Sequence, residues 1–207
     1  MLLILLVVLA VLGTGIVVSN VRSRKTLPKA SPPPKALTSG TGDLVERGVN
    51  DLRVNDVLTM GDKDFLTEGL LAYDEDGHRW TGARIVDNQT VYWLVNGIER
   101  VSSKAQRLLT QDLETQISGY PPEALVIGDV RFALDKRGTA SVQLFGDVGA
   151  LSELKKGRPE GHTERCRWWL YSAPGDDTMI IEQWGSDFRV LRGQRVGDGI
   201  IELIPGS

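Results

Sequence analysis

The sequence predicts a mainly β fold, in which two related antiparallel β units pack together and follow one transmembrane helix. Three observations predict this arrangement. The first is an uncharged apolar stretch at residues 1–18. The second is a series of short runs with alternating apolar and polar residues, separated by Gly and Asp turns, through residues 43–207. The third is a likeness between the two halves of that region, which indicates an internal repeat.

Residues 1–21 are the predicted transmembrane helix. An uncharged helix over residues 1–18 would span about 27 Å, close to the thickness of the hydrocarbon core. Cations follow at residues 22–25, and cytoplasmic flanks are the ones enriched in Lys and Arg. We therefore expect a single-pass protein of the cell membrane with its carboxyl-terminal domain in the cytoplasm. Two alternatives remain: a secretory signal cleaved near the small residues 13–15, and a buried helix of the folded domain.

Residues 22–42 form a predicted basic linker rich in Pro, Gly and Ser. Its prolines at residues 32–34 favour an extended chain, and the Ser-Gly-Thr-Gly that follows is a flexible composition. Five cations and no acid lie in the first 42 residues, which leaves 19 of the 24 Lys and Arg residues against all 27 Asp and Glu residues and a net charge of −8 beyond them. The expected protein is a basic tether joined to an acidic domain. The net negative charge of that domain disfavours binding to a nucleic-acid backbone.

Residues 43–207 are the expected β-rich globular domain. Turn signals at Asp76-Gly77, at Asp87-Asn88 and at residues 175–177 separate runs of strand length. Because the runs follow one another closely, with no long helical pattern in each gap, they predict antiparallel meanders. The predicted strands are residues 65–73, 79–86, 90–95, 139–145, 165–172, 178–184, 187–192 and 199–204.

The internal repeat divides this domain into units at about residues 43–101 and 120–207. The copies begin at residues 54–57 and 127–130, and each continues through strands of similar order. In this alignment Trp80 matches Trp168, and the strand of Trp93 matches the strand of Trp184. Two such units would pack together so that neither apolar face is exposed to water.

A short helix is predicted between the two units. Ser103 and Gln106 resemble a capping box, and Gly119 is a plausible end for the helix. The apolar residues with helical spacing are Val101, Ala105, Leu108, Leu109, Leu113 and Ile117.

Several stretches carry a resemblance to a known family. They are VNDVLTMGDKDFLTEGLLAYDEDGHRWTGARIVD from residue 54, LVIGDVRFAL from residue 125, RWWLYSA from residue 167 and TMIIEQWGSDFRVLRGQRV from residue 178. With the terminal IELIPG they resemble the bacterial domain of unknown function 4178 over nearly all of residues 52–206. The resemblance implies a β-rich fold and an association with the cell envelope, and it implies no reaction and no site residues.

We predict no catalytic, metal-binding or cofactor-binding residue. His78 and His162 are the two histidines, and neither has a second ligand at metal-site spacing. No phosphate-binding loop, dinucleotide fingerprint or nucleophile elbow is present in the sequence. Cys166 is expected to be a small buried hydrophobic residue, and a lone cysteine agrees with a reducing compartment.

Strand carboxylates and aromatics are the remaining candidates. Glu68, Glu153 and Glu182 lie on or beside apolar strands and are expected to face water. The densest aromatic group is expected in the core, although Trp169 and Tyr171 would make interface anchors if they shared an exposed face. That group consists of Trp168, Trp169, Tyr171 and Trp184.

The sequence therefore favours a membrane-anchored cytoplasmic domain that binds a protein partner and is not an enzyme. An enzyme that uses carboxylates in a cleft between the two β units is the second hypothesis. An exported binding domain, released after signal cleavage, is the third. The membrane itself is the other expected partner, through the amino-terminal helix.

Overall fold

Eleven antiparallel strands make up most of the described chain, which in this computed structural model covers residues 47–101, 105–197 and 199–206. The strands are β1 (Val57–Met60), β2 (Lys63–Glu75), β3 (His78–Asp87), β4 (Thr90–Asn96), β5 (Gln106–Asp112), β6 (Ala124–Ile127), β7 (Val130–Gly146), β8 (Thr163–Ser172), β9 (Asp177–Trp184), β10 (Asp187–Val196) and β11 (Ile201–Ile204). The helical segments in this part are short: η1 (Val49–Asp51), η2 (Gly149–Leu151) and α2 (Ser152–Lys155).

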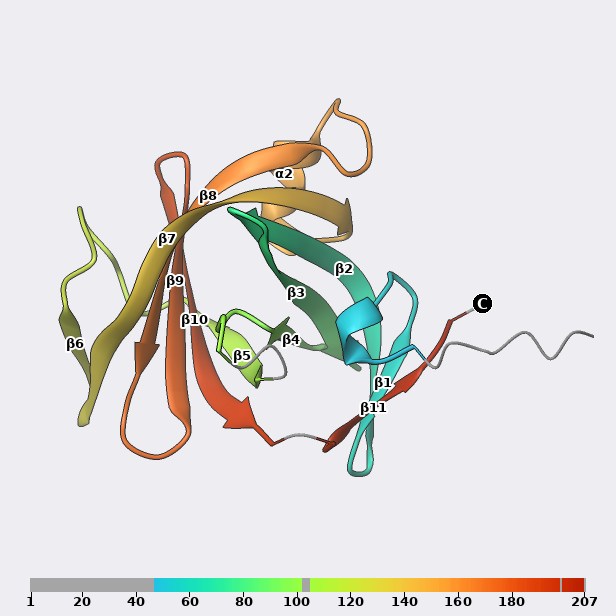
Figure 1. Cartoon of the computed structure of the whole chain (residues 1–207), viewed down its shortest axis with the longest axis horizontal. Coiled ribbons are helices and arrows are strands. Elements are labelled where there is room, and N and C mark those ends of the chain that lie inside the picture. The colour runs from blue at the N-terminus through green and yellow to red at the C-terminus, as the bar shows by residue number, and fades with distance from the viewer. Residues whose placement is uncertain (1–46, 102–104, 198, 207) are drawn as a thin grey trace, which may run out of the picture. The chain divides into compact units, whose positions relative to one another are not determined.

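The strands form one sheet in the order β11-β1-β2-β3-β4-β5-β10-β9-β8-β7-β6. An additional pairing between β2 and β7 joins Gly69 to Gly146 and Asp74 to Ser141, so that the eight strands from β2 round to β7 form a closed ring (Figure 1). Strand β6 extends the sheet beyond β7, and β1 with β11 extends it beyond β2. The closed ring gives the domain an enclosed interior and two ends.

Two predicted hairpin turns have the backbone that their residues favour. Asp76 and Gly77, between β2 and β3, have φ angles of 52° and 83°. Asn88, between β3 and β4, has a φ of 54°. Asp, Asn and Gly are the residues that most readily adopt positive φ, which hairpin turns matched to the strand twist require. The turns predicted from the sequence at these positions are confirmed.

Alternation along the strands divides the apolar side chains between the interior and two outer clusters. The interior cluster includes Trp80, Trp93, Trp168 and Trp184. One outer cluster lies where β1 and β11 cover β2 to β4, and the other lies where β6 and the start of β7 cover β8 to β10. Each large apolar side chain buried in these clusters contributes about 1.5–3 kcal/mol to the free energy of unfolding. The single sheet is therefore stabilised by three apolar clusters.

The prediction of a helix between the two units is wrong for the residues that the structure describes. Residues 106–112 form β5, which pairs with β4 on one side and β10 on the other. Leu108 and Leu109 have the spacing of a helix face, but as neighbours in a strand they point to opposite sides and enter different apolar clusters. Two ladders of backbone hydrogen bonds here outweigh a local helical pattern. Residues 102–104 lie outside the described chain.

Two meanders share the one sheet. Strands β2 to β5 form the first meander and β7 to β10 the second, and the edges meet through the β2–β7 and β5–β10 pairings. The prediction of two separate packed units is thus replaced by a continuous antiparallel sheet. Trp80 and Trp168 each lie on the second strand of their meander, and their ring centroids are 5.4 Å apart in the interior.

None of the helices in the described part of the chain has the length and apolar character that a membrane crossing requires. The predicted transmembrane helix at residues 1–21 and the linker at residues 22–42 lie outside the described residues. Both stay predictions.

Candidate functional site

A buried ion pair occupies the interior of the closed sheet. Glu182 on β9 is 2% exposed, although the sequence pattern suggested that it faces water. Its carboxylate accepts hydrogen bonds from Tyr73 Oη at 2.6 Å, from Trp184 Nε1 at 3.0 Å and from Arg189 Nε at 2.9 Å. Arg189 on β10 is directly opposite in the strand register. Three donor side chains, one of them the positively charged Arg189, offset the cost of burying the Glu182 carboxylate.

Arg189 is held between this carboxylate and an aromatic ring. Its Nε and Nη2 donate to Glu182, and its Cζ lies 4.1 Å from the centre of the Trp93 ring. The third nitrogen, Nη1, is buried and has no hydrogen-bond partner among the described residues. A buried donor without an acceptor costs about 1–3 kcal/mol, so Arg189 retains unused binding capacity.

Burial also sets the protonation of the neighbouring groups. Burial and then the Glu182 charge raise the pKa of Tyr73 well above its usual range, so Tyr73 stays a neutral donor. The same two causes raise the pKa of the Cys166 thiol well above its usual range. Because the thiolate is the reactive form, Cys166 is an inert core residue, as its sequence context predicts.

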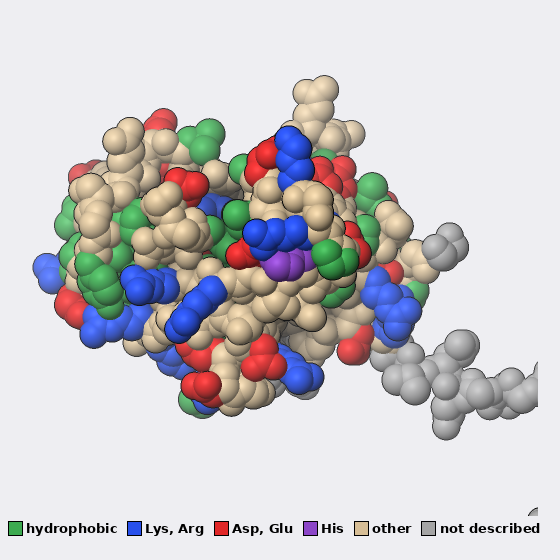
Figure 2. All heavy atoms as spheres, turned by 90° about the horizontal axis from the view of Figure 1, so that it is seen from above, with side chains coloured by type: hydrophobic (Ala, Val, Ile, Leu, Met, Phe, Trp, Pro, Cys, Tyr) green, Lys and Arg blue, Asp and Glu red, His purple; other side chains and the backbone are tan. Residues whose placement is uncertain are grey.

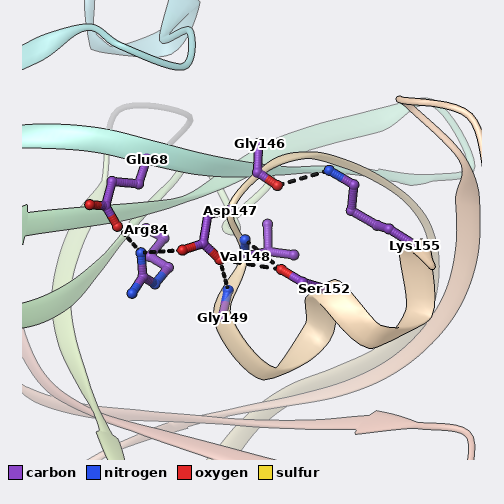
Figure 3. Close-up of polar contacts among 8 residues, drawn as sticks. All are labelled: Glu68, Arg84, Gly146, Asp147, Val148, Gly149, Ser152 and Lys155. Carbon is purple, nitrogen blue, oxygen red and sulfur yellow. Dashed lines mark hydrogen bonds and ion pairs between the residues drawn. The ribbon is translucent and has the colours of Figure 1, made fainter.

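A second charged cluster lies at the end of the ring where β7 leads into α2 (Figure 3). Arg84 Nη1 donates to Glu68 and, at 3.3 Å, to Asp147 Oδ2. Asp147 Oδ1 accepts from Gly149 N at 2.8 Å and from Ser152 Oγ at 3.3 Å. The Gly149 N–H, together with the Arg84 charge, holds the pKa of Asp147 below its usual range. Arg84 therefore ties the segment that follows β7 to strands β2 and β3.

Close backbone contact explains why glycines lie in this end. Gly146 has a φ of 62°, and a Cβ there would overlap the backbone oxygen of Glu68 and the side chain of Val54. At Gly69 a Cβ would overlap the backbone oxygen of Asp147. Only glycine at these two positions lets the segment after β7 lie this close to β2. Lys155 Nζ also donates a hydrogen bond to Gly146 O at 2.8 Å (Figure 3).

A pocket of about 420 Å³ opens at this end of the sheet. Arg84 and Arg189 are its charged lining residues, and Trp93 also lines it. The apolar wall consists of Val91, Val148 and Leu151. A pocket of this size with an apolar wall and a few polar groups has the makeup of a small-molecule site.

The opposite end of the ring is closed by another buried arginine. Arg107 is 0% exposed, donates to Glu99, and places Nε 3.2 Å from Thr178 Oγ1. Arg195 also donates to Glu99, at 2.5 Å. Ile98, which precedes Glu99 in the chain, is buried in the interior cluster. The polar contacts at this end join β5 to β9 and join both β5 and β10 to Glu99.

A wide groove crosses the outer face of the sheet over β5 and β10. Its volume is about 860 Å³. Leu108 lies in its floor, Met60 and Ile200 line one side, and Val130 and Phe132 line the other. Asp176 and Asp177 lie at its border. The groove has apolar residues on both sides.

The surface elsewhere carries both signs of charge. Figure 2 shows Lys and Arg side chains interspersed with Asp and Glu on the face seen from above. Among the ion pairs of the described residues are those of Arg158 with Glu164 at 2.5 Å and of Lys155 with Glu160 at 3.0 Å. His162 also contacts Glu164, at 2.9 Å, and belongs to such a surface network.

The remaining sequence candidates divide between surface and core. Glu153 is 80% exposed and pairs with Lys156 at 3.7 Å, as expected for a solvated carboxylate. His78 lies at the Ile98 end, 3.3 Å from a backbone oxygen. Within the described residues no group of three His, Cys, Asp or Glu side chains could hold a metal ion. The four clustered aromatics, Trp168, Trp169, Tyr171 and Trp184, are all buried, as the sequence predicts.

Sequence reasoning missed the arginines of the interior. Arg107 and Arg189 each lie two residues before an inward-pointing leucine of the same strand, Leu109 and Leu191. That signal was present in the alternation, because an Arg at an inward position of one strand and a Glu at an inward position of the next predict a buried pair.

The fold and the site together define an all-β domain built on a closed antiparallel sheet, with a buried ion pair and a pocket at one end. The chain belongs to the family described as domain of unknown function (DUF4178), whose family model matches residues 53–198. No curated protein and no solved structure matches the chain. The match to the family model confirms the resemblance to domain of unknown function 4178.

Proposed function

We propose that the chain is a single-pass membrane protein whose β domain lies in the cytoplasm and binds a partner protein. The observation that carries the proposal is the outer groove, because an open hollow of about 860 Å³ with apolar residues on both sides suits an extended peptide segment. The uncharged residues 1–18 and the cations that follow them support the anchor and its orientation.

The charges at the groove indicate the chemistry of its partner. Arg192 lies 3.7 Å from Asp112, and Arg195 donates to Glu99, so both cations of the lining have acidic neighbours. Within the described residues no ion pair involves Asp176 or Asp177. The groove therefore favours a segment with apolar side chains and a nearby Lys or Arg.

Site-specific photo-crosslinking tests this proposal. A photoreactive residue replaces Gln194 in the groove or, as a matched control, Gln143, an exposed glutamine on β7 outside the groove lining. The proposal predicts a discrete adduct from position 194 and not from 143, and its loss in the Ile200→Glu variant. Equal adducts from both positions contradict it.

Membrane orientation needs its own measurement. A carboxyl-terminal reporter that is active only outside the cytoplasm stays inactive if the domain is cytoplasmic. An active reporter, together with a mature amino terminus near Thr14 or Ile16, would instead support an exported binding domain.

An enzyme that uses carboxylates is the second candidate function. It is favoured by Glu68 and Asp147, which converge on Arg84 beside the pocket at the α2 end. Under this hypothesis the Glu68→Gln/Asp147→Asn variant fails to replace the native protein in cells while its groove adduct persists. Under the binding hypothesis the Ile200→Glu variant is the one that fails.

The two meanders also support the proposal that the domain arose from two related β units. Their matching strand order, and the contact between Trp80 and Trp168, are what two related halves joined edge to edge would have.

A further inference from the structure

The pocket at the α2 end combines unused hydrogen-bond donors with an apolar wall. Nη1 of Arg189 has no partner among the described residues, and the Arg189 side chain, which is 7% exposed, lines the pocket. Arg84 uses Nη1 for both of its carboxylate partners, so the rest of its guanidinium is left for another acceptor. Two guanidinium groups with spare donors therefore border one hollow.

The charge around the pocket indicates whether that acceptor is charged. No Asp or Glu belongs to the pocket lining itself. Behind the lining, however, Glu182 pairs with Arg189, while Glu68 and Asp147 pair with Arg84. Lys155 also acts on Asp147 and pairs with Glu160, so four carboxylates stand against three cations, and an anion would enter against a slight negative excess. An uncharged acceptor such as a carbonyl oxygen meets no such cost.

Apolar residues indicate the rest of the ligand. Val91, Val148 and Leu151 form one wall, and the ring of Trp93 lies beside them under the Arg189 guanidinium. A hollow of about 420 Å³ holds a body the size of one or two rings.

We propose that this pocket binds a small uncharged molecule with an apolar body and a carbonyl oxygen, such as a primary amide. The carbonyl accepts a hydrogen bond from Arg189, and the body packs against Trp93, Val148 and Leu151. This site is separate from the outer groove and does not depend on the groove having a protein partner.

NMR spectra of the arginine side chains, recorded on the full-length protein in detergent micelles, test the proposal directly. Benzamide is added to protein labelled with ¹⁵N-arginine, and the Nε–H signals of Arg84 and Arg189 are followed. We expect both signals to shift and to saturate at millimolar benzamide, as suits a ligand of this small size. Benzoate, which has the same shape and a negative charge, is expected to bind at least tenfold more weakly.

Three variants separate binding in the pocket from other causes. Arg189→Lys keeps a cation beside Glu182 but lacks Nη1, and is expected to bind benzamide about tenfold more weakly. Val91→Trp fills the pocket and is expected to abolish the shift, whereas Thr163→Trp, at an exposed site of β8 outside the lining, leaves it unchanged. If Val91→Trp does not fold, Gln111→Trp replaces it, because Gln111 is an exposed lining residue.

The proposal is overturned by any of three results. These are the absence of a saturable shift at Arg84 and Arg189, a shift that persists in the filled-pocket variant, and tighter binding of benzoate than of benzamide. The last result would show that the pocket selects an anion.

Discussion

Replacing Glu182 by Gln should strongly destabilise the domain. The change keeps the size of the side chain but removes the charge that compensates Arg189, which is only 7% exposed. Removing one partner of a buried ion pair costs about 3–5 kcal/mol. For a domain of this size each kcal/mol lowers the melting temperature by about 2–4 °C, so we expect a decrease of about 6–20 °C.

Thermal and urea unfolding of the full-length protein, followed by tryptophan fluorescence, measures this decrease. Glu153→Gln is the matched control, because that carboxylate and its Lys156 partner are both 80% exposed and the change should cost less than about 0.5 kcal/mol. The double variant Glu182→Leu/Arg189→Met should regain most of the lost stability, since it leaves no unpaired charge. A loss below about 1 kcal/mol for Glu182→Gln would refute the reasoning.

Three further predictions concern backbone, pH and thiol chemistry. Gly146→Ala should lower the unfolding free energy more than Gly61→Ala, because both have φ near 60° but only Gly146 has backbone within contact of an added Cβ. Burial acts to raise the pKa of Asp112, yet hydrogen bonds from Thr115 and Glu114 hold it below its usual range. Its stabilisation is therefore complete above the unfolded pKa of about 3.9 and is lost as the pH falls through the lower folded pKa, so stability should fall more steeply on acidification than in Asp112→Asn. Cys166 is 0% exposed, so a thiol reagent should label it only at the rate of unfolding.

Each of these has a contrary result. Equal losses for the two glycine variants would show that the added Cβ at Gly146 finds room. Parallel acid profiles for the wild type and Asp112→Asn would show that Asp112 makes no net contribution. Labelling of Cys166 in the native state, without urea, would show that the interior opens.

The strands and their turns were the most predictable part of the fold. The runs over residues 165–172 and 178–184 led to β8 and β9 because both are short stretches rich in β-branched and aromatic residues and bounded by turn residues. Turn residues Asp76, Gly77 and Asn88 marked the hairpins because positive φ restricts the choice of residue. Both signals are local, so one sequence carries them.

Features that depend on distant partners were not predictable. β5 carried helical spacing, and only the free edges of β4 and β10 made it a strand. β7 extends over Val130–Gly146, well beyond the predicted 139–145, because it pairs with β6, β8 and β2 in turn. The Glu182–Arg189 pair lies within one hairpin, but the pocket beside it also needs Trp93 of β4 and the segment after β7, so the pocket stayed hidden.

Closure of the ring has a consequence for how the domain folds. The pairings that complete it, β2 with β7 and β5 with β10, join residues far apart along the chain, and loop-closure entropy makes such contacts slow to form. Either meander alone would leave both of its outer strands with unpaired backbone groups, which are templates for association with other chains. Half-domain fragments should therefore aggregate, and the complete domain should fold slowly and in a single cooperative step.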